Sequence, residues 1–274
     1  SQHIVGPGGK GSNQAIAAAK LNGKVNFITK IGNDKNGEMA LNLYKSLGMD
    51  VASIIQDKNH STGVAGIMVN EKTGDNAINI IPGAAGTLTN DDIEKNLNFI
   101  ANTDIFLTQL ETPYDVTKYA LKKAKENKLT TILNPAPACK INDEDFKLID
   151  FFTPNETEAE FYLNKKIETE KDIKIASEEF LKKGIKNIVI TLGDKGCYFA
   201  NDKENFFMNA FKLKEPVVDT TGAGDAFNGA LAVGLSKDLD IKEVLTFANK
   251  VGAISTTKQG AAASMPSMED LNNY

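Results

Sequence analysis

Apolar positions along the chain alternate between short β-branched runs and longer stretches with helical spacing. The short runs predict strands at residues 25–31, 104–110, 130–134, 151–153, 188–192 and 197–200. The longer stretches predict helices at residues 13–21, 37–47, 91–100, 114–127, 156–162, 172–183, 226–235 and 241–256. Strands separated by helix-length segments indicate parallel βαβ units. We therefore expect an α/β fold with one doubly wound, mainly parallel sheet.

Two stretches near the start of the chain interrupt this alternation. Residues 62–69 and 77–81 predict a hairpin joined by the polar turn Lys72-Thr73-Gly74-Asp75, which we expect to form a small accessory β sheet. Residues 1–5 predict a short strand fragment that runs into a glycine-rich segment. No repeat or linker divides the chain, so we expect residues 1–274 to form a single domain.

The composition and net charge limit which classes of molecule the protein is expected to bind. The 274 residues are 41% hydrophobic and 24% charged, and the net charge of −5 argues against nucleic acid and anionic membranes. No apolar run approaches transmembrane length, and no signal peptide is visible. Cys139 and Cys197 stand in unrelated contexts and predict free thiols in a reducing, cytoplasmic compartment. All 31 Lys and Arg positions are lysines, so no arginine of this chain can stabilise a transferring phosphoryl group.

The strongest candidate for chemistry lies at residues 217–230. Val217 and Val218 predict the end of a strand, Gly222-Ala223-Gly224-Asp225 a tight turn, and the residues from 226 onward a helix. Backbone N–H groups at a helix start have no intrahelical partner, and a turn without Cβ atoms lets an anion approach them. Asp225 adds a carboxylate to the same turn. A base beside an anion site is what phosphoryl transfer to a hydroxyl needs.

The same turn also has a purely structural interpretation. Gly-x-Gly turns are common, and an aspartate in the first turn stabilises the helix dipole. Two well-known nucleotide motifs are excluded. A dinucleotide fingerprint requires a third glycine where Phe227 stands, and a Walker A motif requires Ser or Thr after its lysine, whereas Gly11 follows Lys10.

Several predicted strands end in polar or glycine-rich residues. Glu111, Asn134 and Asn155 follow three of them, and residues 191–196 follow a fourth. Ligands of open α/β sheets bind outside the carboxyl ends of the strands, so we expect these residues to lie along one edge. Their convergence supports a ligand site more strongly than any one of them alone.

Some of these residues have two interpretations. Asn155 and Glu158 predict a helix cap with its capping-box partner, or else residues that hold the hydration shell of Mg²⁺. Lys10 is either solvated or part of a loop that wraps a small polyol. His3 and His60 lack Cys or acidic neighbours at ligand spacing, so neither is assigned to a metal.

Taken together, these segments resemble the ribokinase-like sugar kinases. The resemblance covers nearly the whole chain, and the Gly222-Ala223-Gly224-Asp225 turn matches the family signature. The other segments that carry it are residues 8–15 (GGKGSNQA), 61–65 (STGVA), 109–113 (QLETP), 133–137 (LNPAP), 153–160 (TPNETEAE), 191–193 (TLG), 219–229 and 255–266.

The resemblance implies an ATP-dependent kinase that transfers the γ-phosphoryl group to the 5-hydroxyl of D-ribose. Asp225 would be the base, and the N–H groups of Gly222, Ala223, Gly224 and Asp225 the anion hole. The sugar would be bound by Gly9, Lys10, Gly11, Ser12, Asn13, Glu111 and Asp225. ATP would be contacted by Asn155, Thr191, Leu192, Gly193, Asp194, Lys195, Gly196, Gly224, Asp225 and Asn249, and Glu158 would organise hydrated Mg²⁺.

The resemblance further implies a bound K⁺, a lid and a dimer. The K⁺ positions would be Asp219, Thr221, Ser255, Lys258, Gly260 and Ser264, several through backbone carbonyls. Carbonyl and carboxylate oxygens suit such a hard cation. The lid would come from about residues 1–8 and 61–82 and would also form a homodimer interface.

Alternative functions remain at this point. One is a related kinase acting on fructose, a keto-deoxy sugar acid or a nucleoside; another is a non-catalytic sugar- or nucleotide-binding protein on the same fold. Members of the family begin with a strand that carries an Asn-x-Asp motif, and this sequence starts after it. We therefore expect a truncated sequence with an incomplete sugar site.

Overall fold

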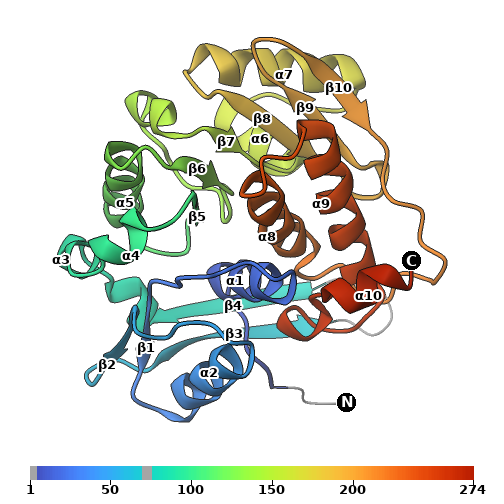
Figure 1. Cartoon of the computed structure of the whole chain (residues 1–274). Helices are drawn as coiled ribbons and strands as arrows, with labels where there is room; N and C mark the ends of the chain where they lie inside the picture. Colours follow the sequence, from blue (N-terminus) through green and yellow to red (C-terminus); the bar gives the residue numbers. More distant parts are fainter. Residues whose placement is uncertain (1–4, 70–75) are drawn as a thin grey trace.

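The computed structural model describes residues 5–69 and 76–274 and is built around a six-stranded sheet (Figure 1). The strands lie in the order β10 (Asn205–Met208), β9 (Cys197–Ala200), β8 (Asn187–Thr191), β7 (Phe151–Phe152), β6 (Thr130–Leu133) and β5 (Ile105–Thr108). Neighbours from β5 to β8 are parallel, whereas β9 runs antiparallel to both β8 and β10. The predicted α/β fold with a mainly parallel sheet is confirmed.

Helices cover both faces of this sheet. On one face lie α1 (Lys10–Lys20), α8 (Ala223–Leu235) and α9 (Ile241–Ser255), and on the other lie α6 (Glu156–Leu163) and α7 (Glu170–Lys182). Successive strand residues point to opposite faces. Accordingly, Ile132 packs with the first group of helices and Leu133 with the second, and both are almost fully buried.

A third layer of packing flanks β5. Helix α5 (Tyr114–Glu126) buries Val116 and Ala120 against the short helices α3 (Asn90–Glu94) and α4 (Leu97–Ala101). The same cluster reaches the parallel pair β1 (Thr29–Gly32) and β2 (Ile54–Asp57), which α2 (Lys35–Ser46) connects. The remaining elements are η1 (Ala84–Thr87), η2 (Asp143–Leu148), η3 (Gly193–Lys195), η4 (Ala262–Ser264) and α10 (Met268–Asn272).

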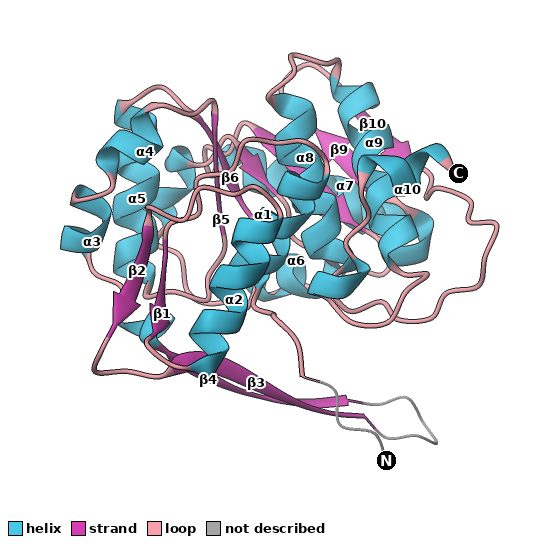
Figure 2. Ribbon diagram, turned by 60° about the horizontal axis from the view of Figure 1, so that its bottom comes forward, coloured by secondary structure: helices cyan, strands magenta, loops and turns pink. Residues whose placement is uncertain are grey.

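The predicted accessory hairpin is a two-stranded arm that projects from the helical body (Figure 2). Its strands β3 (Thr62–Val69) and β4 (Asn76–Gly83) are antiparallel, with Val64 opposite Ile81. The predicted turn at 72–75 lies outside the described residues. Residues 1–4, which belong to the predicted strand fragment 1–5 and to the predicted lid segment 1–8, also lie outside the described residues.

The base of the arm is tied to the body through Asp34. This carboxylate caps α2 by accepting from Gly37 N at 2.9 Å, and it accepts from Thr62 N at 2.8 Å and Thr62 Oγ1 at 2.7 Å. Gly32 N donates to Thr62 Oγ1 at 2.9 Å, and a Cβ on Gly32 would lie only 2.4 Å from Thr62 N. The joint is therefore formed largely by main-chain atoms in contact.

Several predicted elements differ from the structure. Helix 91–100 is divided into α3 and α4, strand 25–31 shortens to β1, and strands β2 and β10 were not predicted. No strand ends at Val217 and Val218: their side chains are exposed, and Val218 N and Asp219 N both donate to Thr256 O. Among the described residues, no helix combines the length and apolar character needed to cross a membrane.

Helices α1 and α8 begin three residues earlier than predicted, at Lys10 and Ala223. In each case a glycine with positive φ precedes the first helical residue, Gly9 at 89° and Gly222 at 82°. Glycine adopts this conformation without steric cost, so it marks the start of the helix more reliably than the apolar pattern does. Both glycine-rich segments therefore form the first turns of helices rather than loops.

Candidate active site

The site is centred on the first turn of α8. Gly222 has a φ of 82°, and a Cβ there would lie 3.1 Å from Met265 Cε and 3.2 Å from Ala261 Cβ. Ala223 N donates to Thr220 O at 3.2 Å and Ala226 N to Gly222 O at 2.9 Å. The N–H groups of Gly224 and Asp225 lie in the first turn between Ala223 and Ala226, at the positive end of the helix dipole. This turn is suited to an anionic group.

Asp225 is buried in this turn, with 5% of its surface exposed. Its Oδ2 accepts from Asn13 Nδ2 at 2.8 Å and its Oδ1 from Gln14 Nε2 at 3.0 Å. Burial raises the pKa of the carboxyl above its ordinary value, while the positive charge of Lys10 and the two amide donors act in the opposite direction. A carboxylate held in this way is suited to accept a proton.

The start of α1 brings a second carboxylate close by. Lys10 N donates to Glu111 Oε2 at 2.7 Å, and a Cβ on Gly9 would lie 3.7 Å from the same oxygen. Burial raises the pKa of Glu111, and the negative charge of Asp225 adds to the rise. Gly9, Lys10 and Glu111 are therefore brought to the same region as Asp225, and their role in sugar binding stays a prediction.

The two polar residues that follow Gly11 have different environments. Asn13 donates to Asp225, but its Oδ1 is buried and has no hydrogen-bond partner in the described part of the chain. An unpaired buried acceptor is costly, and a ligand hydroxyl would satisfy it. Ser12 Oγ instead accepts from Tyr44 OH of α2 at 2.8 Å, which uses one acceptor position of this hydroxyl and leaves its hydrogen to donate.

Two of the predicted ATP-binding segments lie side by side. Asn155 and Thr191 form a parallel bridge, and Thr191 N donates to Pro154 O at 3.0 Å. Asn155 and Glu158 form the predicted capping box: Asn155 Oδ1 accepts from Glu158 N at 2.7 Å, and Glu158 Oε2 from Asn155 N at 2.9 Å. The cap occupies one atom of each side chain and leaves the others available.

The turn after β8 continues this surface. Leu192 N donates to Gly196 O at 2.8 Å, so residues 192–196 form a closed loop in which Gly193, Asp194 and Lys195 are exposed. Asn249 of α9 lies next to it, because Asn249 Nδ2 contacts Sγ of the buried Cys197 at 3.5 Å. The predicted residues of α6, the β8–β9 turn and α9 are thus brought to one edge.

The chemistry of Glu158 fits a hydrated metal ion. Burial raises its pKa, and the charge of Asp225 contributes to this rise. Within residues 5–69 and 76–274, no three His, Cys, Asp or Glu side chains are grouped as a metal-binding set. Mg²⁺ keeps most of its waters and needs only one or two protein carboxylates beside phosphate oxygens. A single carboxylate facing the site therefore agrees with such an ion.

The predicted K⁺ positions lie in the segment before α8 and in the stretch from the end of α9 to η4, and Asp219 joins the two. Asp219 Oδ1 accepts from Thr221 N and Oδ2 from Gly260 N, both at 2.9 Å. Partial burial would raise the pKa of Asp219, but these hydrogen bonds outweigh it and lower the pKa. The hydroxyls of Ser255 and Ser264 donate to Gly252 O and Ala261 O, and Lys258 Nζ pairs with Asp270 Oδ1. Backbone carbonyls and one carboxylate are oxygen ligands that suit a monovalent cation.

The site also contains residues that the sequence analysis did not single out as functional. Gln14, Gln109, Thr153 and Asn228 join Asn134 in a chain of side-chain hydrogen bonds around Asp225. The sequence around Gln14 gives no clear signal, because Gln14 follows two other polar residues and stands directly before the apolar run 15–19, yet it is 1% exposed.

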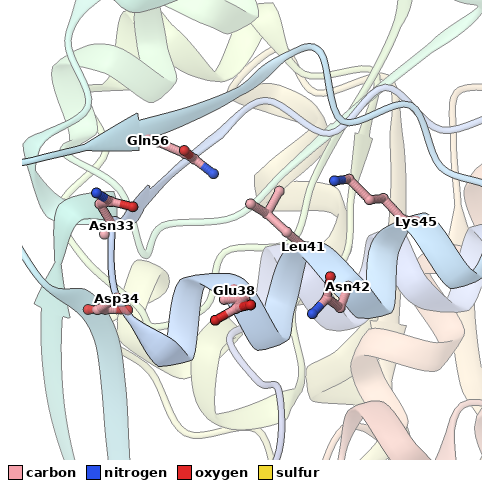
Figure 3. Close-up of a pocket in the computed structure, with 8 residues that line it drawn as sticks. Asn33, Asp34, Glu38, Leu41, Asn42, Lys45 and Gln56 are labelled. Carbon is pink, nitrogen blue, oxygen red and sulfur yellow. The ribbon is translucent and has the colours of Figure 1, made fainter.

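A separate pocket of about 360 Å³ lies between α2 and the β1–β2 pair (Figure 3). Glu38, Leu41 and Lys45 of α2 face it, with Gln56 of β2 opposite. It shares no residue with the surroundings of Asp225. Asp34 on its rim is already bonded to Gly37 and Thr62.

Comparisons with known proteins agree with this arrangement. Residues 2–268 match the model of the pfkB family carbohydrate kinases. The chain is 40% identical over 266 residues to a ribokinase of Staphylococcus aureus (strain COL), covering 97% of this chain and 86% of that protein. It is 35% identical over 271 residues to a deoxyribokinase of Salmonella typhimurium (strain LT2), covering 98% and 88%. An Arabidopsis thaliana ribokinase complexed with ribose and ATP has a TM-score of 0.89 and 29% identity, covering 97% of this chain and 86% of that one.

Proposed function

The chain belongs to the pfkB family of carbohydrate kinases, and we propose that it transfers the γ-phosphoryl group of ATP to the 5-hydroxyl of D-ribose. One observation supports this activity above all. A buried carboxylate, Asp225, lies in the first turn of a helix whose N-terminus suits an anion, and it is held there by two side-chain amides of α1. A binding protein without catalysis would gain nothing from burying a base at that position.

The sugar is assigned to the region between the first turn of α1 and Glu111. Glu111 and Asn13 Oδ1, which has no partner in the ranges 5–69 and 76–274, accept hydrogen bonds from sugar hydroxyls, and Gly9 and Gly11 allow the ring to approach the backbone. Lys10 contributes positive charge beside both carboxylates. Ser12 belongs to this set as well, because its hydroxyl accepts from Tyr44 and keeps its own hydrogen to donate.

ATP is assigned to the neighbouring edge formed by Asn155, the turn at residues 191–196 and Asn249. The support for this assignment is the Asn155–Thr191 bridge and the contact of Asn249 with Cys197, which bring these three segments together. On this arrangement the phosphates extend toward the first turn of α8, which lies between the nucleotide and the sugar.

The reaction follows from these positions. Asp225 accepts the proton of the 5-hydroxyl as the oxygen attacks the γ-phosphorus and the bond to the β-phosphate bridging oxygen breaks. The N–H groups of Gly224 and Asp225 hold the negative charge that spreads over the transferring oxygens. The chain contains no arginine, so the positive side chain nearest to this charge is assigned to Lys10.

Two ions complete the proposal. Glu158 would hold Mg²⁺ through water, and bound Mg²⁺ would neutralise charge on the phosphate oxygens. Asp219, Thr221, Ser255, Lys258, Gly260 and Ser264 would hold K⁺ beside the anion site, largely through backbone carbonyls. The bond between Gly260 N and Asp219 Oδ2 supports this assignment, because it fixes the two segments against each other.

The arm of β3 and β4 is proposed as a lid and as the contact surface of a homodimer, within a single domain of residues 1–274. Val64, Ile80 and Ile81 are exposed on it, each with more than 40% of its surface accessible, and a second copy of the arm would cover them. We also assign the protein to the cytoplasm, because both cysteines are free thiols. Size-exclusion chromatography with light scattering tests the dimer, and Ile81→Asp is expected to shift it toward the monomer.

The activity is tested by ADP release from ATP and Mg²⁺ with D-ribose, 2-deoxy-D-ribose, D-fructose and adenosine in turn, each with K⁺ or with Na⁺. Turnover with ribose that rises in K⁺ is expected. 2-Deoxy-D-ribose is included because a deoxyribokinase is among the similar proteins. Binding of ATP without turnover on any acceptor would instead support the non-catalytic alternative.

A further inference from the structure

A chain of amide and hydroxyl groups links the carboxyl ends of three strands to Asp225. Gln109, which follows β5, donates through Nε2 to Gln14 Oε1. Gln14 Nε2 donates to Asp225 Oδ1 at 3.0 Å and to Asn134 Oδ1, which follows β6, at 3.1 Å. Asn134 Nδ2 donates to Thr153 O, which follows β7, at 3.1 Å.

The chain continues to the turn that holds Asp225. Thr153 Oγ1 donates to Asn228 Oδ1 at 2.7 Å, and Asn228 Nδ2 donates to Gly224 O at 2.8 Å. Apart from the half-buried Gln109, the side chains in this chain are buried. The path therefore branches at Gln14: one branch ends on Asp225, and the other reaches the backbone of the helical turn that carries Asp225.

The orientation of the Gln14 amide follows from Asn134, whose Nδ2 donates to the backbone oxygen of Thr153, so that its Oδ1 faces Gln14 as an acceptor. Gln14 Oε1 accepts from Gln109, so its Nε2 faces the two acceptors, Asn134 Oδ1 and Asp225 Oδ1. Turning the amide of Gln14 around would place its oxygen against the carboxylate and its nitrogen against a donor, leaving buried groups unpaired. The surroundings thus specify a donor, rather than an acceptor, toward Asp225.

We propose that Gln14 is a positioning residue for Asp225, and that Gln109 and Asn134 act through Gln14. The proposal rests on Asp225 being the base of the proposed kinase. Gln14 fixes the orientation of the carboxylate and stabilises its ionised form, which is the form that accepts the proton. The polar residues that end β5 and β6 therefore serve the base through a side chain of α1.

Charged groups around Asp225 set the background against which Gln14 acts. Lys10 of α1 favours the ionised carboxylate, whereas Glu111 after β5 and Glu158 of α6 add negative charge. Burial opposes ionisation most strongly of all. The positive charge of Lys10 does not fully offset the effect of burial, so loss of the Gln14 donor is expected to raise the pKa of Asp225 further.

The test is Gln14→Met, which keeps the length and volume of the side chain and removes its donors. A hydrogen bond to a charged group contributes enough to shift a pKa by about 1 to 2 units. In the variant, kcat is expected to fall about 10- to 100-fold at pH below the pKa of the base and to recover at high pH. ATP and Mg²⁺ ionise identically with every variant, so the displacement between profiles belongs to the protein.

A second readout does not depend on activity. Aspartate labelled with ¹³C at the side-chain carboxyl reports only Asp residues, and the Asp225 signal is the one missing from Asp225→Asn. Its titration midpoint is expected to be higher in Gln14→Met than in the wild type. Ser177→Ala, which removes a buried hydroxyl bonded to Ile173 O within α7, serves as the control with an unchanged midpoint.

The outcomes separate the two hypotheses. If the wild type turns over ribose and Gln14→Met loses kcat equally at every pH with an unchanged Asp225 midpoint, Gln14 is structural and the proposal is wrong. If the wild type shows no turnover with any acceptor, the proposed function fails, while the labelled carboxyl still measures the effect of Gln14. Should Gln14→Met fail to fold, Gln109→Met at the half-buried end of the chain is expected to give a smaller shift in the same direction.

Discussion

Asn13 Nδ2 lies 2.8 Å from Asp225 Oδ2, although 212 positions separate the two residues in the chain. The bond joins the first turns of α1 and α8, so both glycine-rich segments contribute to one buried site. The other atom of the same amide, Asn13 Oδ1, has no partner among the described residues. Asn13 therefore connects the base with the place where a substrate hydroxyl is expected.

Asp225→Asn is expected to lower kcat by roughly two to four orders of magnitude, the contribution of a positioned base. An amide cannot accept the proton, but it retains the size of the carboxylate, so KM for ribose is expected to change little. Its nitrogen faces the donor of Asn13 or Gln14, so the free energy of unfolding is expected to fall by about 1–3 kcal/mol. Steady-state ADP release and a thermal melt measure the two effects. Near-complete turnover in the variant would contradict the assignment of Asp225 as the base.

Glu111→Gln is expected to raise KM for ribose about tenfold while leaving kcat nearly unchanged, since hydrogen bonds to a charged acceptor are stronger than those to a neutral one. The pKa of Glu111 is raised, so in the wild type KM is expected to rise as the pH falls through that pKa. The variant lacks this titration. A pH series of KM for both proteins checks the point, and a loss confined to kcat would argue against a role in sugar binding.

Gly222→Ala tests the left-handed residue at the start of α8. The backbone conformation alone costs roughly 1–2 kcal/mol for alanine, and the new methyl group would also press on Met265 and Ala261. Gly48→Ala is the matched control, because Gly48 has a φ of 71° and no atom within 4 Å of an added Cβ. Both variants are expected to lose stability in urea, but only Gly222→Ala is expected to lose kcat.

Thr62→Val tests whether the Asp34 contact sets the position of the arm. Valine keeps the shape of threonine but loses the bonds to Asp34 Oδ1 and Gly32 N. We expect ATP hydrolysis without sugar to rise relative to ribose phosphorylation, because a lid that closes poorly admits water. Thr62→Ser restores the hydroxyl and is expected to restore the wild-type ratio; equal ratios in all three proteins would show that this contact does not control closure.

Asp150→Asn tests a charge cluster at the amino ends of the strands. Asp150 accepts from Lys125 Nζ at 2.6 Å, Lys186 Nζ at 2.7 Å and Thr131 N at 3.0 Å. Burial alone would raise its pKa, but these contacts outweigh burial and lower it. The stabilisation is therefore present above the ordinary value of 3.8 and is lost as the pH falls through the lowered pKa.

At pH 7 the variant is expected to lose about 1 to 2 kcal/mol in the free energy of unfolding, because it loses charged hydrogen bonds to a buried carboxylate, while water can solvate Lys186, which is 65% exposed. Urea titrations between pH 7 and pH 3 measure the difference, which is expected to shrink toward the acid end. The value of kcat is expected to stay unchanged, since the cluster lies at the opposite edge of the sheet from Asp225. A difference that is constant with pH would contradict the charge interpretation.

The periodicity of the sequence predicts most of the sheet and helices, because strands such as β8 and helices such as α5 bury continuous or one-sided apolar sets. The periodicity predicts the starts of α1 and α8 less accurately, by three residues in each case. Glycine has low helix propensity, so Gly11 and Gly224 were assigned to loops, whereas the first turn of a helix tolerates them. Strand β10 carries Phe206 and Phe207 on opposite faces of an edge, a pattern too short to detect before its antiparallel partner is known.

The candidate site was predicted in part for the same reason. Residues at strand ends converge because parallel strands share one edge, which the alternation of elements already implies. Gln14 donates to Asp225, and Asn13 Oδ1 has no hydrogen-bond partner among the described residues. Both facts depend on contacts between segments far apart in the chain. No local pattern carries such information, so the roles of these two amides required the structure.

The contact between Gly32 and Thr62 at the base of the arm has a consequence for how the protein tolerates mutation. A Cβ on Gly32 would lie 2.4 Å from Thr62 N, so any other residue at this position would force the two backbone segments apart. Val64 and Ile81, farther along the arm, are exposed, so substitutions there are expected to leave the fold intact even where they weaken the proposed dimer. A library that samples all residues of this region is therefore expected to show a sharp boundary, with variable positions along the arm and an invariant glycine where it joins the body.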